Sequence, residues 1–183
     1  MSAAKMIKRQ RDRILPYLQR LFGYAQNLSR DREKARDLVQ DTACKALAAR
    51  QIPHDEAAYR AWLFRILRNQ FIDDLRRQGR DDRRLTEINT EAHQSVEYWQ
   101  GDERLINRLT VRAAIARVKP GQAEILALID VAGLSYREAA DVMDVPVGTI
   151  MSRLSRARAA LLNELEGEGG LVLEMTKQRK QRG

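Results

Sequence analysis

The residues of this sequence that are best suited to chemistry are arginines and hydroxyl-bearing residues on one face of a predicted helix. Residues 135–160 read SYREAADVMDVPVGTIMSRLSRARAA. Ser135 and Glu138 form a capping box, and the short helix that they start precedes a turn at 144–146 and a longer helix. Such a helix-turn-helix places arginine, serine and threonine side chains against base edges and phosphates in the major groove of DNA. The outward face of the longer helix is therefore expected to bind DNA through Thr149, Ser152, Arg153, Arg156 and Arg158.

A helical hairpin whose arginines merely face solvent is the alternative interpretation of these residues. The capping box favours DNA binding, as does the small residue Ala140 at the point where the two helices are expected to cross. No acidic residue occurs between Val147 and Ala160, so the outward face is uniformly basic. Ile150 and Leu154 lie on the opposite face and are predicted to be buried.

A second stretch, residues 59–80, interleaves aromatic rings with arginines in the order YRAWLFRILRNQFIDDLRRQGR. Rings that stack on bases and cations that follow the phosphates are what a platform for single-stranded nucleic acid requires. The same apolar residues also fit the buried stripe of a helix, and Trp62 in particular is expected in the core. The spacing alone leaves both interpretations open.

Residue types that support catalysis or metal binding are scarce. Cys44 is the only cysteine, and the two histidines, His54 and His93, lie far apart in the sequence. An internal disulfide and a cysteine-based zinc site are therefore excluded, and no metal or cofactor is expected. The sequence shows no acid–base pair, no nucleophile with a nearby base and no phosphate-binding glycine loop. We expect neither enzyme activity nor a small-molecule substrate.

The formal net charge of +8 predicts attraction to polyanions, of which nucleic acid is the commonest. A solvated basic surface, or a segment that docks on acidic lipids, is the alternative. No run of about 18 apolar residues occurs, so no membrane span is expected. The basic N-terminal segment is not followed by an apolar run of signal-peptide length, and the protein is therefore expected to be cytoplasmic.

The elements that must position these residues are predicted to be helices. Apolar residues recur at helical spacing, while strand-like alternation is missing, which predicts an all-α fold. The pattern fails over residues 79–101, which are predicted to be a flexible linker between two small helical domains at 1–78 and 102–166. Residues 167–183 are predicted to be a basic tail. The predicted helices cover 14–28, 31–48, 59–79, 102–118, 120–133, 135–143 and 147–165.

The helix predicted over 31–48 differs in character, because acidic, amide and basic side chains share its exposed face. Asp37, Gln40 and Asp41 lie on this face. A face of mixed charge usually just meets solvent, but it is equally suited to docking a partner protein.

Three segments together resemble the extracytoplasmic-function (ECF) subgroup of the sigma-70 family. They read DLVQDTACKALA, YRAWLFRILRNQFIDDLRR and GLSYREAADVMDVPVGTIMSRLSRARAAL, in this order, and the resemblance covers about 15–165. It implies that the first domain is sigma region 2, a helical bundle, and that the second is sigma region 4 with its helix-turn-helix. The chain would then bind core RNA polymerase and promoter DNA and direct promoter-specific initiation of a stress-response regulon.

The resemblance also implies roles for particular residues. The helix that carries Asp37, Gln40 and Asp41 would dock on the clamp helices of the largest polymerase subunit. The following loop, 51–58, and the next helix would recognise and open the minus-ten element and capture a flipped base. The last helix would read the minus-35 element, and an anti-sigma factor is an expected partner. The implied minus-ten contacts are Arg60, Phe64, Arg65, Arg68, Asn69, Arg76 and Arg77.

Two residues depart from the family pattern. Asp144 stands where the family usually has glycine, and it is expected to tolerate a positive φ better than most residues do. Met151 stands where a basic residue is common, which removes one expected phosphate contact. Two other functions stay open: a sigma-like mimic that sequesters an anti-sigma factor, and a conventional helix-turn-helix regulator.

Overall fold

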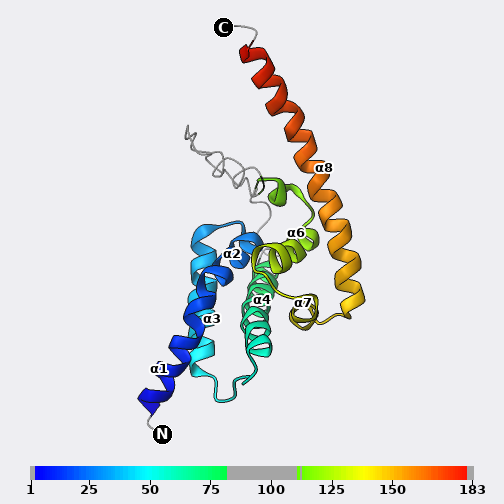
Figure 1. Ribbon diagram of the computed structural model, residues 1–183. Helices are drawn as coiled ribbons and strands as arrows, with labels where there is room; N and C mark the ends of the chain where they lie inside the picture. The colour runs from blue at the N-terminus through cyan, green and yellow to red at the C-terminus, as the bar shows by residue number, and fades with distance from the viewer. Residues whose placement is uncertain (1–2, 82–110, 112, 181–183) are drawn as a thin grey trace.

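The computed structural model describes residues 3–81, 111 and 113–180 of the chain (Figure 1). Within these residues every regular element is a helix, which confirms the predicted all-α fold class. The linker predicted over 79–101 and the helix start predicted at Asp102 lie almost entirely outside the described residues. Residues 113–117 are helical, in agreement with the end of the helix predicted there.

The first domain consists of helices that pack around α4. Its first element, α1, was not predicted, and it continues through the short 3-10 helix η1 into α2. Pro16 lies in η1, and because proline has no backbone N–H it interrupts the regular hydrogen bonding between α1 and α2. Leu21, Leu63 and Leu67 are fully buried between these helices. The elements are α1 (Ala3–Ile14), η1 (Leu15–Tyr17), α2 (Leu18–Ser29), α3 (Arg32–Ala48) and α4 (Glu56–Asp81).

Helix α3 starts where the sequence predicts, at the cap residue Asp31. Its carboxylate Oδ1 accepts hydrogen bonds from the backbone N–H of Glu33 at 2.8 Å and of Lys34 at 3.1 Å. The preceding helix ends at Arg30, whose φ of 55° turns the chain sharply between α2 and α3. The cap therefore fixes the start of the helix that carries the predicted polymerase-docking residues.

Replacing Asp31 with alanine is expected to lower the free energy of unfolding by about 1 kcal/mol, because two backbone donors lose their acceptor. Asp31→Asn is the matched control, since asparagine caps helices about as well as aspartate does. Chemical denaturation of both variants measures the difference. Equal losses in the two variants would show that the carboxylate acts through its charge and not as a cap.

The second domain places α7 and α8 in the predicted helix-turn-helix. Pro120 lies in the first turn of α6, and Gly133 ends the following helical segment with a φ of 71°, as expected. Ser135 and Glu138 form both halves of the capping box. Asp144 has a φ of 53°, so the aspartate does adopt the left-handed conformation at the turn. The elements are α6 (Pro120–Leu126), η3 (Ala127–Val131), α7 (Tyr136–Met143) and α8 (Val147–Lys180).

Helix α8 is longer than predicted. The sequence predicts its end near Leu165 and a basic tail over 167–183, whereas the backbone stays helical to Lys180. Glycine in a helix costs about 1 kcal/mol relative to alanine, which weakens a helix without terminating it, and no proline follows. The helix end predicted near Leu165 was therefore wrong, and the assignment of 167–183 as a basic tail stays a prediction.

The two domains pack against each other in one continuous core. Helix α4 contacts α7, and α2 contacts both α6 and η3. Gly23 of α2 lies close to Val131 of η3: a Cβ atom built on this glycine would be 3.4 Å from Val131 Cγ1. Phe64 and Val142 belong to the same buried cluster, although they come from different domains. This contact brings α4, with its arginines, beside the helix-turn-helix (Figure 1).

Candidate nucleic-acid interface

Helix α8 has the two faces that its sequence predicts. Ile150, Leu154 and Ala157 are buried, with at most 2% of their surface exposed, and they hold the helix against the rest of its domain. The outward side chains Ser152, Arg153 and Arg156 are exposed, and Thr149 is half-buried. The helix therefore presents a basic, hydroxyl-bearing face that a DNA groove could receive.

Local hydrogen bonds order part of this face. Ser152 Oγ donates to the backbone carbonyl of Thr149 at 3.0 Å, and Arg156 Nε donates to the carbonyl of Ser152 at 3.3 Å. Arg158 behaves differently, because its Nη2 lies 2.6 Å from Asp130 Oδ1 in an ion pair with η3. Of the predicted minus-35 residues, Arg158 is thus the one whose charge is already compensated within the domain.

Four of the predicted minus-ten residues lie exposed on α4: Arg65, Asn69, Arg76 and Arg77. Arg76 pairs with Asp73 and Arg77 with Asp74, each at 3.6 Å and one helical turn apart. Exposed pairs of this kind contribute less than about 1 kcal/mol. Arg77 can therefore exchange the Asp74 carboxylate for a phosphate at little cost.

Arg60 and Arg68 point instead toward the second domain. Arg60 makes a bidentate contact with Glu138 of α7, with Nε 2.7 Å from Oε1 and Nη2 2.6 Å from Oε2. Arg68 Nε lies 2.7 Å from Glu124 Oε1 of α6, and the Tyr24 hydroxyl donates to the same oxygen at 3.1 Å. In this arrangement the two arginines hold the domains together and are not available to DNA.

The pair with Arg60 governs the ionisation of Glu138. Burial raises the pKa of Glu138, but hydrogen bonds from Arg60 and from Ser135 outweigh burial, and the net pKa lies below the ordinary value. The hydrogen bond to Glu138 also raises the pKa of the Arg60 guanidinium. Glu138 is only 4% exposed, so this ion pair is largely shielded from water.

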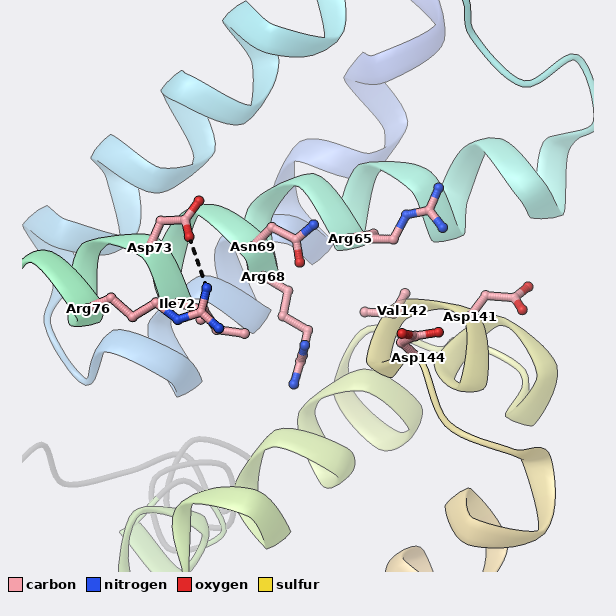
Figure 2. Close-up of a pocket in the computed structure, with 9 residues that line it drawn as sticks. All are labelled: Arg65, Arg68, Asn69, Ile72, Asp73, Arg76, Asp141, Val142 and Asp144. Atoms are coloured by element: carbon pink, nitrogen blue, oxygen red, sulfur yellow. Dashed lines mark ion pairs between the residues drawn. The ribbon is translucent and has the colours of Figure 1, made fainter.

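A groove of about 520 Å³ lies beside these pairs, between α4 and α7 (Figure 2). One side of the groove carries cationic and amide side chains of α4. The other side carries two carboxylates, one within α7 and one at its C-terminal cap. Arg68 points across the opening toward the second domain in Figure 2. The lining includes Arg65, Arg68, Asn69 and Arg76 on one side and Asp141 and Asp144 on the other.

The structure corrects the assignment of Phe64. Its ring is fully buried and lies 5.5 Å from the ring of Tyr24, centroid to centroid. A ring enclosed in this way packs the core and offers no face for a base to stack on. Trp62 is half-buried and packs against the core, in keeping with the expectation for this residue, and its ring lies 5.7 Å from that of Tyr59.

The predicted polymerase-docking residues Asp37, Gln40 and Asp41 are all exposed on α3. Asp41 Oδ2 accepts a hydrogen bond of 2.6 Å from Gln70 Nε2 of α4, which fixes this carboxylate. Asp37 and Asp41 also line a shallow groove of about 420 Å³ between α3 and the C-terminal part of α4. The structure therefore brings these residues together on one accessible surface.

Comparison with known proteins gives two family matches that fall on the two domains. Residues 14–81 match the model of sigma-70 region 2, and residues 108–161 match that of sigma-70 region 4. The chain is 34% identical over 151 residues to the ECF RNA polymerase sigma factor EcfG of Rhodopseudomonas palustris, covering 82% of each chain. This chain belongs to the ECF subgroup of the sigma-70 family.

Other relatives agree with this membership. The RNA polymerase sigma-H factor of Pseudomonas aeruginosa is 30% identical to this sigma factor over 166 residues, covering 84% of each chain. The sigma factor RpoE of Bartonella quintana, solved in complex with the anti-sigma factor NepR, is 34% identical. Its structure matches with a TM-score of 0.68 over 85% of this chain and 96% of that one.

The sequence did not reveal which side chains pair with Arg60 and Arg68. Glu138 was recognised only as half of a capping box, and Glu124 and Tyr24 were not singled out. Nothing in the local spacing reveals an ion pair between residues 78 positions apart, such as Arg60 and Glu138. In the described part of this sigma factor, no helix is both long and apolar enough to cross a membrane, and no cluster of metal-binding side chains occurs.

Proposed function

We propose that this sigma factor docks on core RNA polymerase through α3, recognises and opens the minus-ten element through α4 and the preceding loop, and reads the minus-35 element through α8. The observation that supports this most directly is that one chain carries two basic helical faces. One is on α4 in sigma region 2 and the other is on α8 in sigma region 4. Phosphate contacts would position the protein, and base contacts would select the promoter. All chemical steps would belong to the polymerase, and the sigma factor would act in the cytoplasm without catalysis of its own.

In vitro transcription with core polymerase on a promoter library tests this function. A sigma factor directs initiation at a defined subset of promoters. A mimic that only sequesters an anti-sigma factor supports no initiation, and a conventional regulator supports none without another sigma factor. The exposed Arg153 and Arg156 favour promoter binding over mimicry, because a mimic has no need of a DNA-binding face.

Replacing Asp37 and Asp41 with lysine is expected to weaken binding to core polymerase by about tenfold or more, because two charges of a docking face are reversed. A small loss of thermal stability is expected as well, because Asp41→Lys removes the acceptor of the buried Gln70 amide, whereas Asp37 is simply exposed. The variant Asp12→Lys/Glu166→Lys is the matched control, because it makes the same change in net charge at two other exposed acids. Equal core affinity of the two variants, measured by fluorescence anisotropy, would contradict the assignment of α3.

We further propose that an anti-sigma factor holds this protein inactive, as the complex of the Bartonella quintana relative suggests. The same surfaces cannot serve polymerase and an inhibitor together, so the two should compete. Isolation of the sigma factor from unstressed cells, followed by competition with core polymerase, tests this proposal. Recovery of the protein without a stoichiometric partner, and fully active in transcription, would leave control to synthesis alone.

A further inference from the structure

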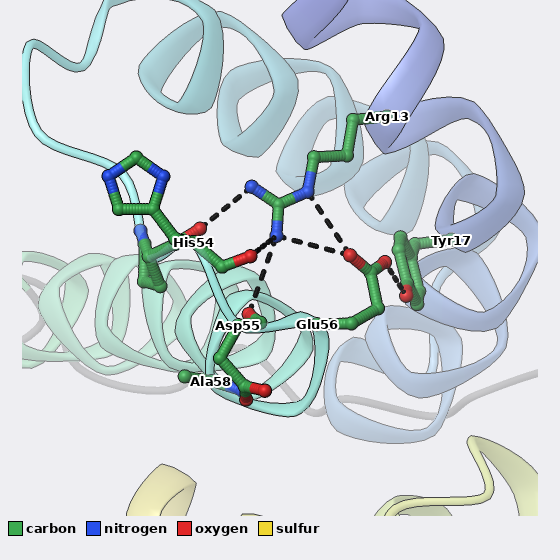
Figure 3. A network of polar contacts seen from close by, with 7 residues as sticks. Arg13, Tyr17, His54, Asp55, Glu56 and Ala58 are labelled. Atoms are coloured by element: carbon green, nitrogen blue, oxygen red, sulfur yellow. Dashed lines mark hydrogen bonds and ion pairs between the residues drawn. The ribbon is translucent and has the colours of Figure 1, made fainter.

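The loop between α3 and α4 is held from one side by a single arginine of α1 (Figure 3). Arg13 Nη1 donates to the backbone carbonyl of Pro53 at 2.7 Å. Its Nη2 donates to the carbonyl of His54 at 3.0 Å and approaches that of Asp55 at 3.4 Å. The same guanidinium contacts Glu56 Oε2 at 3.2 Å from Nε and 3.1 Å from Nη2.

This set of contacts defines the shape of the loop. In an extended chain successive carbonyls point to opposite sides, so three consecutive carbonyls can meet one cation only if the main chain curls around it. Guanidinium suits this task because its five N–H donors are fixed in one plane. The carbonyl of Asp55 already accepts the first helical hydrogen bond of α4, from the Tyr59 N–H at 2.9 Å. Residues 50–54 lie outside the helices, so Arg13 supplies the main constraint on the carbonyls of Pro53 and His54.

The arginine is itself held in place by buried aromatic residues. Its guanidinium carbon lies 3.8 Å from the centroid of the Tyr59 ring, within the range of a cation–π contact, and Tyr59 is only 2% exposed. Tyr17 packs edge-on against Tyr59 and donates its hydroxyl to Glu56. Burial and this hydrogen bond raise the pKa of Tyr17 to about 12, so the donor keeps its proton at physiological pH.

Several side chains of the loop lie on the face opposite Arg13 and are exposed. Gln51, His54 and Asp55 are exposed, and Figure 3 shows the His54 ring pointing away from Arg13. Asp55 Oδ2 accepts a hydrogen bond of 2.8 Å from the backbone N–H of Ala58, which ties the end of the loop to α4. The main chain of the loop is thus fixed while its outer surface stays accessible.

We propose that Arg13 is a positioning residue for minus-ten recognition: it fixes the main chain of residues 53–55 so that the loop meets one unstacked base in a single conformation. The inference rests on the proposed function of the loop. It means that the selectivity of the loop for a base depends on Arg13, a residue that is not itself among the predicted DNA contacts. Selecting among bases requires side chains that are placed to within about half an ångström. A loop released from Arg13 would still attract DNA through the arginines of α4, but it would no longer distinguish one base from another.

The test uses holoenzyme assembled from core polymerase and the full-length sigma factor. The probe is a fluorescent single-stranded oligonucleotide with the non-template minus-ten sequence, made with each of the four bases at every position. Wild-type holoenzyme should prefer one base by about tenfold or more at the position that the loop recognises. Arg13→Ala should reduce this preference to within about threefold. Arg13→Lys, whose ammonium can satisfy fewer of the carbonyls, should fall between the two.

Tyr17→Phe is the matched control, because it removes the hydrogen bond to Glu56 and leaves the contacts between Arg13 and the loop carbonyls. This variant should retain the wild-type base preference. If Arg13→Ala loses its helical circular dichroism, Arg13→Lys carries the test, with a reduced preference at an unchanged melting temperature as the expected result. Wild-type preference in the folded arginine variants would overturn the inference. Absence of any base preference in the wild-type holoenzyme would instead overturn the proposed function of the loop.

Discussion

Replacing Arg153 and Arg156 together with alanine should weaken binding of the sigma factor's second domain to minus-35 DNA by about thirtyfold or more. Each arginine that reads a base edge contributes roughly 1–3 kcal/mol of discrimination. An arginine that meets only phosphate weakens binding to all sequences alike and lowers the dependence of log affinity on log salt by about one unit. Both arginines are exposed, so the fold should remain intact.

Arg158→Ala is the control for this experiment. It removes the same charge from the same helix, but its guanidinium already pairs with Asp130 at 2.6 Å. We therefore expect a smaller loss of DNA binding for Arg158→Ala than for either Arg153→Ala or Arg156→Ala. Titration of minus-35 duplexes at several salt concentrations separates base reading from phosphate contact. Promoter use that is unchanged in the double variant would show that this face of α8 only meets solvent.

Features of the helix-turn-helix were predictable because short-range chemistry determines them. A serine three residues before a glutamate satisfies backbone donors in one turn, and the structure contains both bonds of this capping box. Ile150 and Leu154 are buried because a period of 3.6 residues places them on one side of the helix. Asp144 accepts a positive φ in the turn, as its small polar side chain allows.

Features that depend on distant residues were not predictable from spacing. The family resemblance implies that Arg60 and Arg68 bind DNA, but whether they face DNA or a carboxylate depends on how the domains pack. Phe64 illustrates the same difficulty, because an aromatic ring between arginines fits both a stacking platform and a core. The loop contacts of Arg13 join residues 40 to 43 positions apart, and no local pattern indicates them.

The ion pairs of Arg60 and Arg68 lead to a second large expected effect. Helix α4 cannot bind the minus-ten strand along its whole length while Glu138 and Glu124 occupy these arginines. The variant Glu124→Gln/Glu138→Gln should shift the protein toward separated domains. Glutamine retains the capping box at position 138, so the helix-turn-helix itself should be preserved. Charge-assisted hydrogen bonds are about twice as strong as neutral ones, and we expect the double change to favour opening by roughly 1–3 kcal/mol.

A pair of fluorophores measures this opening. Cys44 is exposed on α3 and serves as one attachment site. A cysteine introduced by Leu162→Cys serves as the other, since Leu162 is 57% exposed on α8. Energy transfer should fall in the glutamine variant, and affinity for a single-stranded minus-ten oligonucleotide should rise about fivefold or more, in line with the expected free energy. Glu33→Gln/Glu164→Gln is the control, because it removes two exposed ion pairs that lie within single domains.

Acid should open the wild-type protein in the same way. The hydrogen bond from Arg60 lowers the pKa of Glu138 only in the closed arrangement, so the ionised carboxylate stabilises that arrangement, and this stabilisation is fully present above the ordinary pKa of 4.5. This contribution is lost as the pH falls through the lowered value, so energy transfer should drop below about pH 4.5. In Glu124→Gln/Glu138→Gln the same acid step should be smaller, since the titrating group is gone. Energy transfer and oligonucleotide affinity that match wild type in this variant would mean that the two ion pairs do not control access to α4.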